Sequence, residues 1–273
     1  MELTKTREQA PRVIWLDSAD STNSELRALA AAESLPHGTV LATAQQTAGR
    51  GRLGREWITP PGTALAVSVL VRNFGISGLG VSWLPLLAGS AVAAALQPLF
   101  GIGQRVGVKW PNDVHVRDEA DAEAGRTGLK LCGVLSEMLP DGSVIVGMGI
   151  NLLIPEWELP TDRATSVLAA GGDVGDAETL DDVSGRELAD RVLAAVVTEL
   201  LRLTELAAEQ PELARKLVLR HSLTLGSEVL VHLPGDRQVD GRARGLGDDG
   251  ALLVDLPTGG ELVVNAGDVE HLR

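Results

Sequence analysis

A segment rich in arginine and glycine, residues 49–57 (GRGRLGREW), constrains this chain more than any other feature. Three arginines and three glycines share residues 49–55, and a tryptophan closes the segment. A guanidinium group binds phosphate or carboxylate through two parallel hydrogen bonds, and closely spaced glycines let the backbone bend around a ligand. Because β-patterned runs at residues 39–44 and 63–71 lie on either side, we predict an anion clamp held between two strands. A solvated loop or a nonspecific nucleic-acid contact is the alternative for this composition.

The overall charge limits the partners of the chain. Its 273 residues are 44% hydrophobic, enough for a buried core, and carry a formal net charge of -13 with a pI near 4.8. Nucleic acids and anionic membranes reward an excess of Lys and Arg through counterion release. The charged N-terminus, residues 1–11, does not resemble a signal peptide. We therefore expect a cytoplasmic protein that binds neither DNA nor membrane, with the arginine segment as a local positive island.

Two rare residue types carry information. Cys132, the single cysteine, lies in an apolar run without a flanking histidine, which favours a core thiol over a nucleophile and fits a reducing compartment. The five histidines show no metal-ligand spacing. Among 24 basic residues only four are lysines, and two of these, Lys109 and Lys130, fall close together in the sequence. A lysine kept in an arginine-rich chain suggests a position that needs a compact ammonium group.

A cluster of small polar residues follows the first predicted strand. Ser21, Thr22 and Asn23 come between an apolar run at residues 13–16 and a helical pattern at residues 25–33. Such residues cap helices, and this is the ordinary interpretation. They can equally supply neutral hydrogen bonds to a polar ligand beside the open N–H groups of the helix start. The spacing does not choose between the two roles.

A second polar cluster interrupts a predicted strand at residues 106–114. Pro111 holds the preceding residue extended, so Lys109, Asn112 and Asp113 would project at a fixed turn. A lysine ammonium can meet phosphate oxygens, and an aspartate can hold the Mg²⁺ that accompanies a nucleoside triphosphate. An exposed salt bridge in a Pro-Asn-Asp turn is the alternative.

The remaining patterns predict an α+β architecture in two parts. Helices are expected at residues 83–100, 185–209 and 211–220, with a short helix near 164–170 and a mobile acidic loop at 117–128. Further strands are expected at residues 131–138 and 143–149. After residue 221 the pattern changes to closely spaced β runs at residues 227–233, 238–246, 251–256 and 261–264. These features predict one domain at residues 1–221 and a small SH3-like β domain at residues 222–273.

Five of these motifs, in this order and spacing, resemble the biotin protein ligases. They are Ser21-Thr22-Asn23, Gln46 with residues 49–57, the run 109–113, Lys130 three residues before Gly133, and the run 147–151. The resemblance covers about the first 220 residues, and the C-terminal β segment is similar to the family's small capping barrel. It implies a mixed-sheet catalytic domain of the class II synthetase-like biotin/lipoate ligase type. Only about 20 residues precede Ser21, too few for the winged helix that lets some members repress transcription, so we expect the short form without a DNA-binding domain.

The resemblance also implies a two-step reaction. Biotin and ATP would form biotinyl-5′-AMP, and a lysine of a biotin carboxyl carrier domain of acyl-CoA or pyruvate carboxylase would then take the biotin. It assigns catalysis to Lys130, Arg50 and Arg52. It assigns biotin to Ser21, Thr22, Asn23, Gln46, Arg50, Gly51, Arg52, Lys130 and Gly133. It assigns ATP to Arg52, Arg55, Trp57, Lys109, Asn112, Lys130 and Asn151, with Asp113 holding Mg²⁺.

Two other functions fit part of these motifs. A lipoate ligase has the same broad fold and adenylate chemistry, although the Gly-Arg-Gly-Arg and Lys-Trp-Pro-Asn-Asp runs point to biotin. A biotin-responsive regulator would bind the adenylate without transferring biotin. The oligomeric state, a monomer or a weak homodimer, stays open because exposed and covered edge strands look alike in a sequence.

Overall fold

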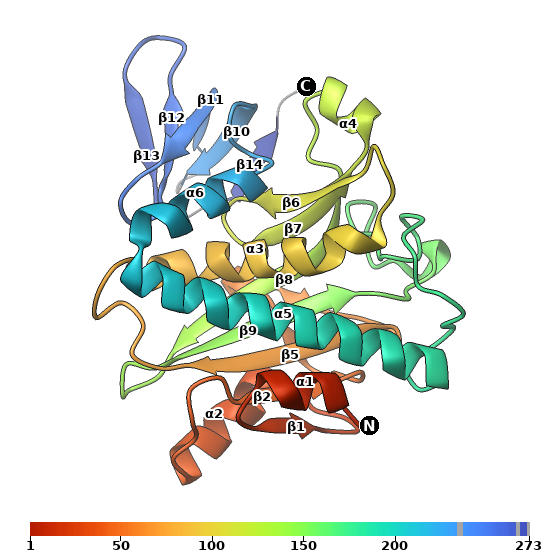
Figure 1. Cartoon of the computed structure of the whole chain (residues 1–273). Helices are drawn as coiled ribbons and strands as arrows, with labels where there is room; N and C mark the ends of the chain where they lie inside the picture. Colours follow the sequence, from red (N-terminus) through yellow and green to blue (C-terminus); the bar gives the residue numbers. More distant parts are fainter. Residues whose placement is uncertain (234–236, 266–267, 272–273) are drawn as a thin grey trace.

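A computed structural model describes residues 1–233, 237–265 and 268–271 of the chain (Figure 1). Its centre is a seven-stranded sheet in the order β1-β2-β5-β9-β8-β7-β6. β1 and β2 are parallel, and each other neighbouring pair is antiparallel. The sheet is mixed and helices pack on it, which confirms the predicted α+β class. The strands are β1 (Val13–Trp15), β2 (Val40–Thr43), β5 (Ala64–Val71), β6 (Arg105–Lys109), β7 (Asp113–Arg117), β8 (Leu129–Met138) and β9 (Val144–Asn151).

One face of this sheet is covered by two long helices. α3 (Leu84–Leu96) lies on the sheet, and α5 (Val183–Glu209) packs against α3 (Figure 1). Successive side chains of a strand point to opposite faces, and on β5 and β9 the alternate residues that face these helices are large and apolar. They form one continuous core with the helices. The segment Val81–Leu99 is long and apolar enough to cross a membrane, but 61% of it is buried inside this core.

The opposite face is covered at one end only. α2 (Thr22–Ala32) packs there through a small apolar cluster that includes Leu26, Leu41, Leu70 and Ile145. Further along the same face, β5 and β9 carry small residues instead, namely Ala66, Ser68, Gly147 and Gly149. Because these two strands present only small side chains there, this part of the sheet is left open for a ligand.

The C-terminal strands form a second, antiparallel sheet in the order β13-β12-β11-β10-β14. They are β10 (Glu228–Leu233), β11 (Arg237–Leu246), β12 (Leu252–Asp255), β13 (Glu261–Val264) and β14 (Asp268–His271). Four of them match the predicted runs, whereas β14 was not predicted. The pairings between described residues do not close this sheet into a barrel. α6 (Pro211–His221) ends just before this sheet. The predicted domain boundary at residue 221 falls at the end of α6 and stays a prediction.

The second sheet is joined to the first part by specific contacts. Trp83 Nε1 donates to the carbonyl of Asp248 at 2.8 Å, and Trp110 Nε1 donates to the carbonyl of Gly250 at 3.0 Å. Both indole rings are buried. Since a buried indole N–H needs an acceptor, these bonds fix the turn between β11 and β12 against the first part.

Two local predictions were wrong, and one helix was not predicted. Residues 164–170 form turns rather than a helix, because Lys130 N donates to the carbonyl of Arg163 at 2.9 Å and Thr165 N donates to the carbonyl of Lys130 at 2.8 Å. The loop at residues 117–128 contains a short helix, α4 (Glu119–Glu123), capped by Asp118. The N-terminal tail contains α1 (Thr4–Gln9), which is tied to α5 because Thr6 N and Oγ1 both donate to the carboxylate of Asp190.

Candidate functional site

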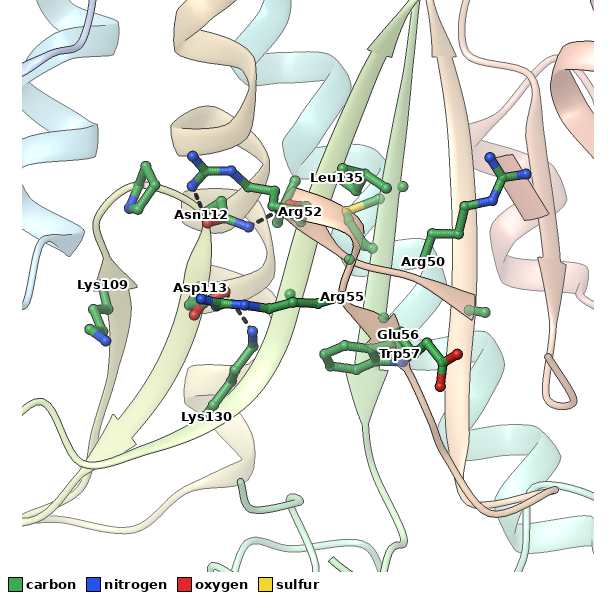
Figure 2. A pocket seen from close by; sticks show the side chains of 18 of the residues that line it. Arg50, Arg52, Arg55, Glu56, Trp57, Lys109, Asn112, Asp113, Lys130 and Leu135 are labelled. Carbon is green, nitrogen blue, oxygen red and sulfur yellow. Dashed lines mark hydrogen bonds and ion pairs between the residues drawn. The ribbon is translucent and has the colours of Figure 1, made fainter. Parts of the chain in front are cut away.

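A cavity of about 460 Å³ lies on the open face of the large sheet (Figure 2). Its volume is within the range of small-molecule sites. Fourteen of the fifteen residues predicted for the site line it: Ser21, Thr22, Asn23, Gln46, Arg50, Gly51, Arg52, Arg55, Trp57, Lys109, Asn112, Asp113, Lys130 and Gly133. Polar segments far apart in the sequence therefore meet at one place.

Glycines make the floor of the cavity. A Cβ atom at Gly149 would lie 2.4 Å from Cε2 of the Trp57 ring, and one at Gly147 would lie 2.3 Å from Oδ1 of Asn23. At Gly133 it would lie 3.0 Å from the Trp57 ring. These distances exclude a larger residue without a shift of the neighbouring side chain. The glycines are needed at this point because side chains from the loop and from α2 lie directly on the strands.

The end of the cavity beside α2 is a network of neutral side chains. Gln46 Oε1 accepts a hydrogen bond from Thr22 N at 2.9 Å. Ser68 Oγ lies 2.8 Å from Thr22 Oγ1 and 2.6 Å from Asn23 Oδ1. Ser21 occupies the N-cap position of α2, but its side chain makes no capping hydrogen bond to this helix, which is described in full. The capping interpretation of Ser21 is therefore not supported, and the residue lines the cavity.

The arginine segment forms a small hairpin over the cavity. β3 (Gly49–Arg50) pairs with β4 (Glu56–Trp57), and between them Leu53 and Gly54 have φ angles of 58° and 73°. Glycine adopts this left-handed region without strain, which is the local reason for Gly54. Arg50 donates to Ser24 on α2, and Arg52 Nη1 donates to Asn112 Oδ1 at 2.9 Å. The hairpin thus spans the cavity from α2 to the turn before β7.

The opposite end of the cavity is cationic. Lys130 Nζ lies 2.7 Å from Asp113 Oδ1 and 5.5 Å from the centroid of the Trp57 ring. Lys109 is the register partner of Asp113 on the neighbouring strand, and Arg55 extends over the same region (Figure 2). Several fixed cations around one point stabilise an anion far better than they would in bulk water. This end is therefore suited to phosphate groups.

Two titratable residues on the strands near this end are buried, one in the cavity wall and one in the core. His115 lines the cavity with 5% of its surface exposed, and burial, followed by the nearby Lys109, lowers the pKa of its imidazole to about 3. Its Nδ1 lies 3.1 Å from the carbonyl of Gly128. Cys132 is fully buried, and burial raises the pKa of its thiol. The predicted core role of Cys132 is confirmed, because a buried thiol with a raised pKa is a poor nucleophile.

One predicted residue lies off the cavity. Asn151 does not line it, and its Nδ2 donates to the carbonyl of Thr165 at 2.9 Å. Its buried Oδ1 has no hydrogen-bond partner among the described residues. The Asn151 side chain thus holds the segment after β9 rather than the cavity wall. Its predicted contact with the nucleotide base stays a prediction.

Several lining residues were not predicted. Arg163 and Glu270 come from distant parts of the chain and form an ion pair, Nη1 to Oε1, at 3.3 Å. Glu270 belongs to β14, so the C-terminal sheet contributes to the cavity. Neither residue lies in a recognisable motif. The glycines at 147 and 149 could be recognised from the sequence. They alternate with Met148 on a strand, so one face of that strand has no side chains there.

The chain resembles known proteins over almost its full length. Residues 15–153 match the Biotin/lipoate A/B protein ligase family, and residues 224–272 match the Biotin protein ligase C terminal domain. It is 37% identical over 254 residues to the Biotin--[acetyl-CoA-carboxylase] ligase of Mycobacterium tuberculosis, covering 93% of this chain and 86% of that protein. The corresponding ligase of Paracoccus denitrificans is 30% identical over 253 residues, which cover 91% of this chain and 96% of that protein.

A solved structure extends this similarity to the fold. The biotin protein ligase from Aquifex aeolicus in complex with biotin and ATP superposes with a TM-score of 0.68 at 29% sequence identity. The match covers 96% of this chain and 99% of that one. The second sheet is therefore part of the shared fold together with the large sheet.

Proposed function

From the premise that this chain belongs to the Biotin/lipoate A/B protein ligase family and is an ATP-dependent biotin protein ligase, we propose how its cavity carries out biotin transfer. Biotin binds with its ring at the neutral end, and ATP binds with its phosphates at the cationic end. The observation that supports this most is that one cavity holds both ends, with Lys130 of β8 at the cationic end.

The first step joins the two substrates. A carboxylate oxygen of biotin attacks the α-phosphorus of ATP, the bond from that phosphorus to the bridging oxygen breaks, and pyrophosphate leaves with the electron pair. The product is biotinyl-5′-AMP. Two anions that repel each other must meet for this attack, so fixed cations lower the barrier. Lys130 and Arg52 supply positive charge where the charge on the transferring phosphate develops, and Arg50 covers the biotin side.

The second step transfers biotin to protein. The uncharged amine of a carrier lysine attacks the acyl carbon of the adenylate and forms an amide bond. AMP leaves with the electrons of the broken C–O bond, and the amine gives its proton to solvent. The hairpin of residues 49–57 would shield the adenylate from water until the carrier binds, since a mixed anhydride hydrolyses readily.

A magnesium ion fits the residues at the cationic end. Asp113 offers one carboxylate beside the phosphate position, and Mg²⁺ is commonly held by one or two carboxylates together with phosphates and water. Within the described residues no group of three or more His, Cys, Asp or Glu side chains could form a metal site from protein ligands alone. Asp113 would therefore hold Mg²⁺ only together with ATP, and Mg²⁺ would neutralise phosphate charge.

The partner we propose is a biotin carboxyl carrier domain of an acyl-CoA or pyruvate carboxylase in the cytoplasm. The names of the most similar relatives support a carboxylase as acceptor. The formal net charge of -13 disfavours nucleic acid and anionic membrane as partners.

One experiment tests the whole proposal. The protein is incubated with a carrier domain, MgATP and biotin, and the carrier is weighed by mass spectrometry. We expect the carrier to gain one biotinyl group, and none when biotin, ATP or Mg²⁺ is omitted. Replacing biotin by lipoate tests the ligase alternative, because a lipoate ligase would add a lipoyl group. Adenylate formation without any change in carrier mass would identify a regulator and contradict transfer.

A further inference from the structure

Two side-chain amides line the neutral end, and the partner of Gln46 fixes which way this amide points. Its Oε1 accepts from Thr22 N at 2.9 Å. A backbone N–H is only a donor, so the oxygen of Gln46 must lie toward α2. The Nε2 group, a donor, is then left on the side of the hairpin glycine Gly49, as its 2.5 Å distance from a Cβ built on Gly49 shows.

Asn23 is fixed in the opposite sense. Its Nδ2 donates to Glu137 Oε1 at 2.7 Å and to the carbonyl of Leu135 at 3.3 Å, which uses both of its amide hydrogens. Both partners accept hydrogen bonds and cannot donate them. Asn23 Oδ1 therefore points away from Glu137, toward Ser68 and the glycine floor at Gly147.

The carboxylate of Glu137 is itself held from α2. Arg27 forms an ion pair with Oε2 of Glu137, while Oε1 accepts from Asn23. Asn23 and Arg27 are four residues apart and lie on the same side of α2. Glu137 is the residue of β8 opposite Ile145, where α2 packs on the sheet. The ion pair thus joins α2 to β8 directly behind Asn23.

Together the two amides offer one donor and one acceptor. A cyclic urea, the head group of biotin, presents a carbonyl that needs a donor beside N–H groups that need an acceptor. The dithiolane ring of lipoate presents neither. We propose that Arg27 and Glu137 are positioning residues that keep Asn23 Oδ1 facing the ligand, and that this orientation selects a cyclic urea. This inference rests on the proposed function, because it assumes that biotin occupies the neutral end.

The substitution Glu137→Gln tests this with little change of shape. A glutamine side chain can present either its oxygen or its NH₂ group to Asn23, so only the longer bond to the carbonyl of Leu135 still holds the amide of Asn23 in its orientation. We expect the dissociation constant of biotin, measured by calorimetry without ATP, to rise on the order of tenfold, since a charge-assisted hydrogen bond is lost. The KM for ATP should stay within about twofold of the wild-type value. A general defect of the fold would instead weaken the binding of both substrates.

A matched control comes from the same helix. Glu33 follows α2 and pairs with Arg12 at 2.9 Å, away from the cavity. Glu33→Gln removes an Arg–Glu ion pair at the C-terminal end of the same helix, and biotin affinity should be unchanged. Arg27→Gln should also raise the dissociation constant of biotin, but by a smaller factor than Glu137→Gln, because Asn23 keeps its carboxylate partner.

An exchange of partners distinguishes positioning from general stability. Asn23→Asp places two carboxylates face to face and should raise the dissociation constant of biotin on the order of 100-fold. In the double variant Asn23→Asp with Glu137→Gln, the introduced amide can donate to the introduced carboxylate, so at least about tenfold of the lost affinity should return. Dethiobiotin, which keeps the urea but lacks sulfur, should lose affinity by the same factors as biotin in every variant.

The inference is overturned if Glu137→Gln changes biotin affinity by less than about twofold, or if the double variant binds no better than Asn23→Asp. Melting temperatures measured without ligand identify a variant that fails to fold, in which case Arg27→Gln decides. Wild-type transfer of biotin to a carrier is measured in parallel. Its absence would contradict the proposed function itself, whereas normal wild-type activity with unaffected variants would contradict only the positioning role.

Discussion

The two ends of the cavity are built in different ways. At the neutral end, Thr22, Asn23 and Ser68 are each less than 5% exposed and are bonded to one another on α2 and β5. At the cationic end, Arg52 and Arg55 stand on a short hairpin, and the Lys130 side chain is 30% exposed. One end is fixed by packing, and the other combines strand residues such as Lys130 with arginines of a loop.

This difference follows from what each end must recognise. Neutral hydrogen bonds discriminate between ligands only when donors and acceptors are held in place, so they belong on packed elements. Charges act over longer distances and stabilise an anion even when a loop has to close first. We therefore expect substitutions at the neutral end to change biotin affinity, and those at the cationic end to change the rate of adenylation or the KM for ATP.

The largest effect should come from Lys130→Ala. The ammonium group lies at the cationic end, beside Asp113, where the proposed attack on the α-phosphate would develop charge. We expect the rate of pyrophosphate release in a single turnover to fall by about 100-fold or more, with biotin affinity changed much less. Lys216→Ala, an exposed lysine on α6, is the control and should behave like the wild type. Adenylation near the wild-type rate in Lys130→Ala would contradict the assignment.

The next effect tests the neutral end. In Gly147→Ala the new methyl group would lie 2.3 Å from Asn23 Oδ1, so Asn23 must move out of its network. We expect the dissociation constant of biotin to rise about tenfold, which corresponds to the lower part of the cost of overpacking. The KM for ATP should change little. Gly101→Ala is the control, because a Cβ at Gly101 meets no atom of the described residues within 4 Å. A variant in which ATP binding falls as much as biotin binding would show that the two ends are not independent.

Local sequence patterns were sufficient for most of the site. The polar turn before α2, the glycines of the hairpin and the proline turn at Pro111 each depend on a few neighbouring residues, so their chemistry could be recognised from short runs. The long helix α5 was likewise visible from its apolar spacing, and it begins at Val183, two residues before the predicted start. These features have in common that neighbours in the sequence determine them.

The parts that could not be predicted depend on distant residues. Glu270 reaches the cavity only because β14 pairs with β10, and Arg163 only because its segment pairs with Lys130. The same pairing explains why residues 164–170 are not helical, since the hydrogen bonds to Lys130 replace those of a helix. The role of Glu137 was hidden for a similar reason, because its partners Asn23 and Arg27 lie more than 100 residues earlier in the sequence.

A smaller effect tests how the hairpin is held. Asn112 accepts from Arg52 and donates from Nδ2 to the carbonyl of Val134 at 2.7 Å, so it links the hairpin to β8. In Asn112→Ala both hydrogen bonds are lost, and with them the link between the hairpin and β8. We expect the KM for ATP to rise about fivefold with biotin affinity unchanged, since a net hydrogen bond contributes roughly 1 kcal/mol.

Limited trypsin digestion provides a second measurement for the same variant. Cleavage within residues 50–55 should be suppressed by biotin with MgATP in the wild type, because the bound adenylate orders the hairpin. The suppression should be weaker in Asn112→Ala. Equal cleavage of the wild type with and without ligands would contradict closure of the hairpin.

The smallest effect concerns acid stability at the cationic end. The pKa of His115 is lowered to about 3, first by burial and then by Lys109, whereas an unfolded histidine titrates near 6.5. Between these two values the unfolded chain binds the extra proton, so the free energy of unfolding falls as the pH falls below about 6.5. We expect His115 to account for about 1 kcal/mol of lost stability between pH 7 and pH 5.5, measured by urea unfolding.

The variant His115→Gln separates this titration from the loss of packing. A packing defect lowers the free energy of unfolding by the same amount at each pH, whereas removal of the titrating group makes its pH dependence less steep. Some dependence should persist, because burial also lowers the pKa of His271, to about 4. Since folded His115 stays neutral above pH 5, the dissociation constant of biotin should not change between pH 5.5 and pH 7. If the free energies of unfolding of the wild type and of His115→Gln changed with pH in parallel, His115 would not be the source of the acid sensitivity. Its imidazole would then bind a proton as readily in the folded as in the unfolded chain.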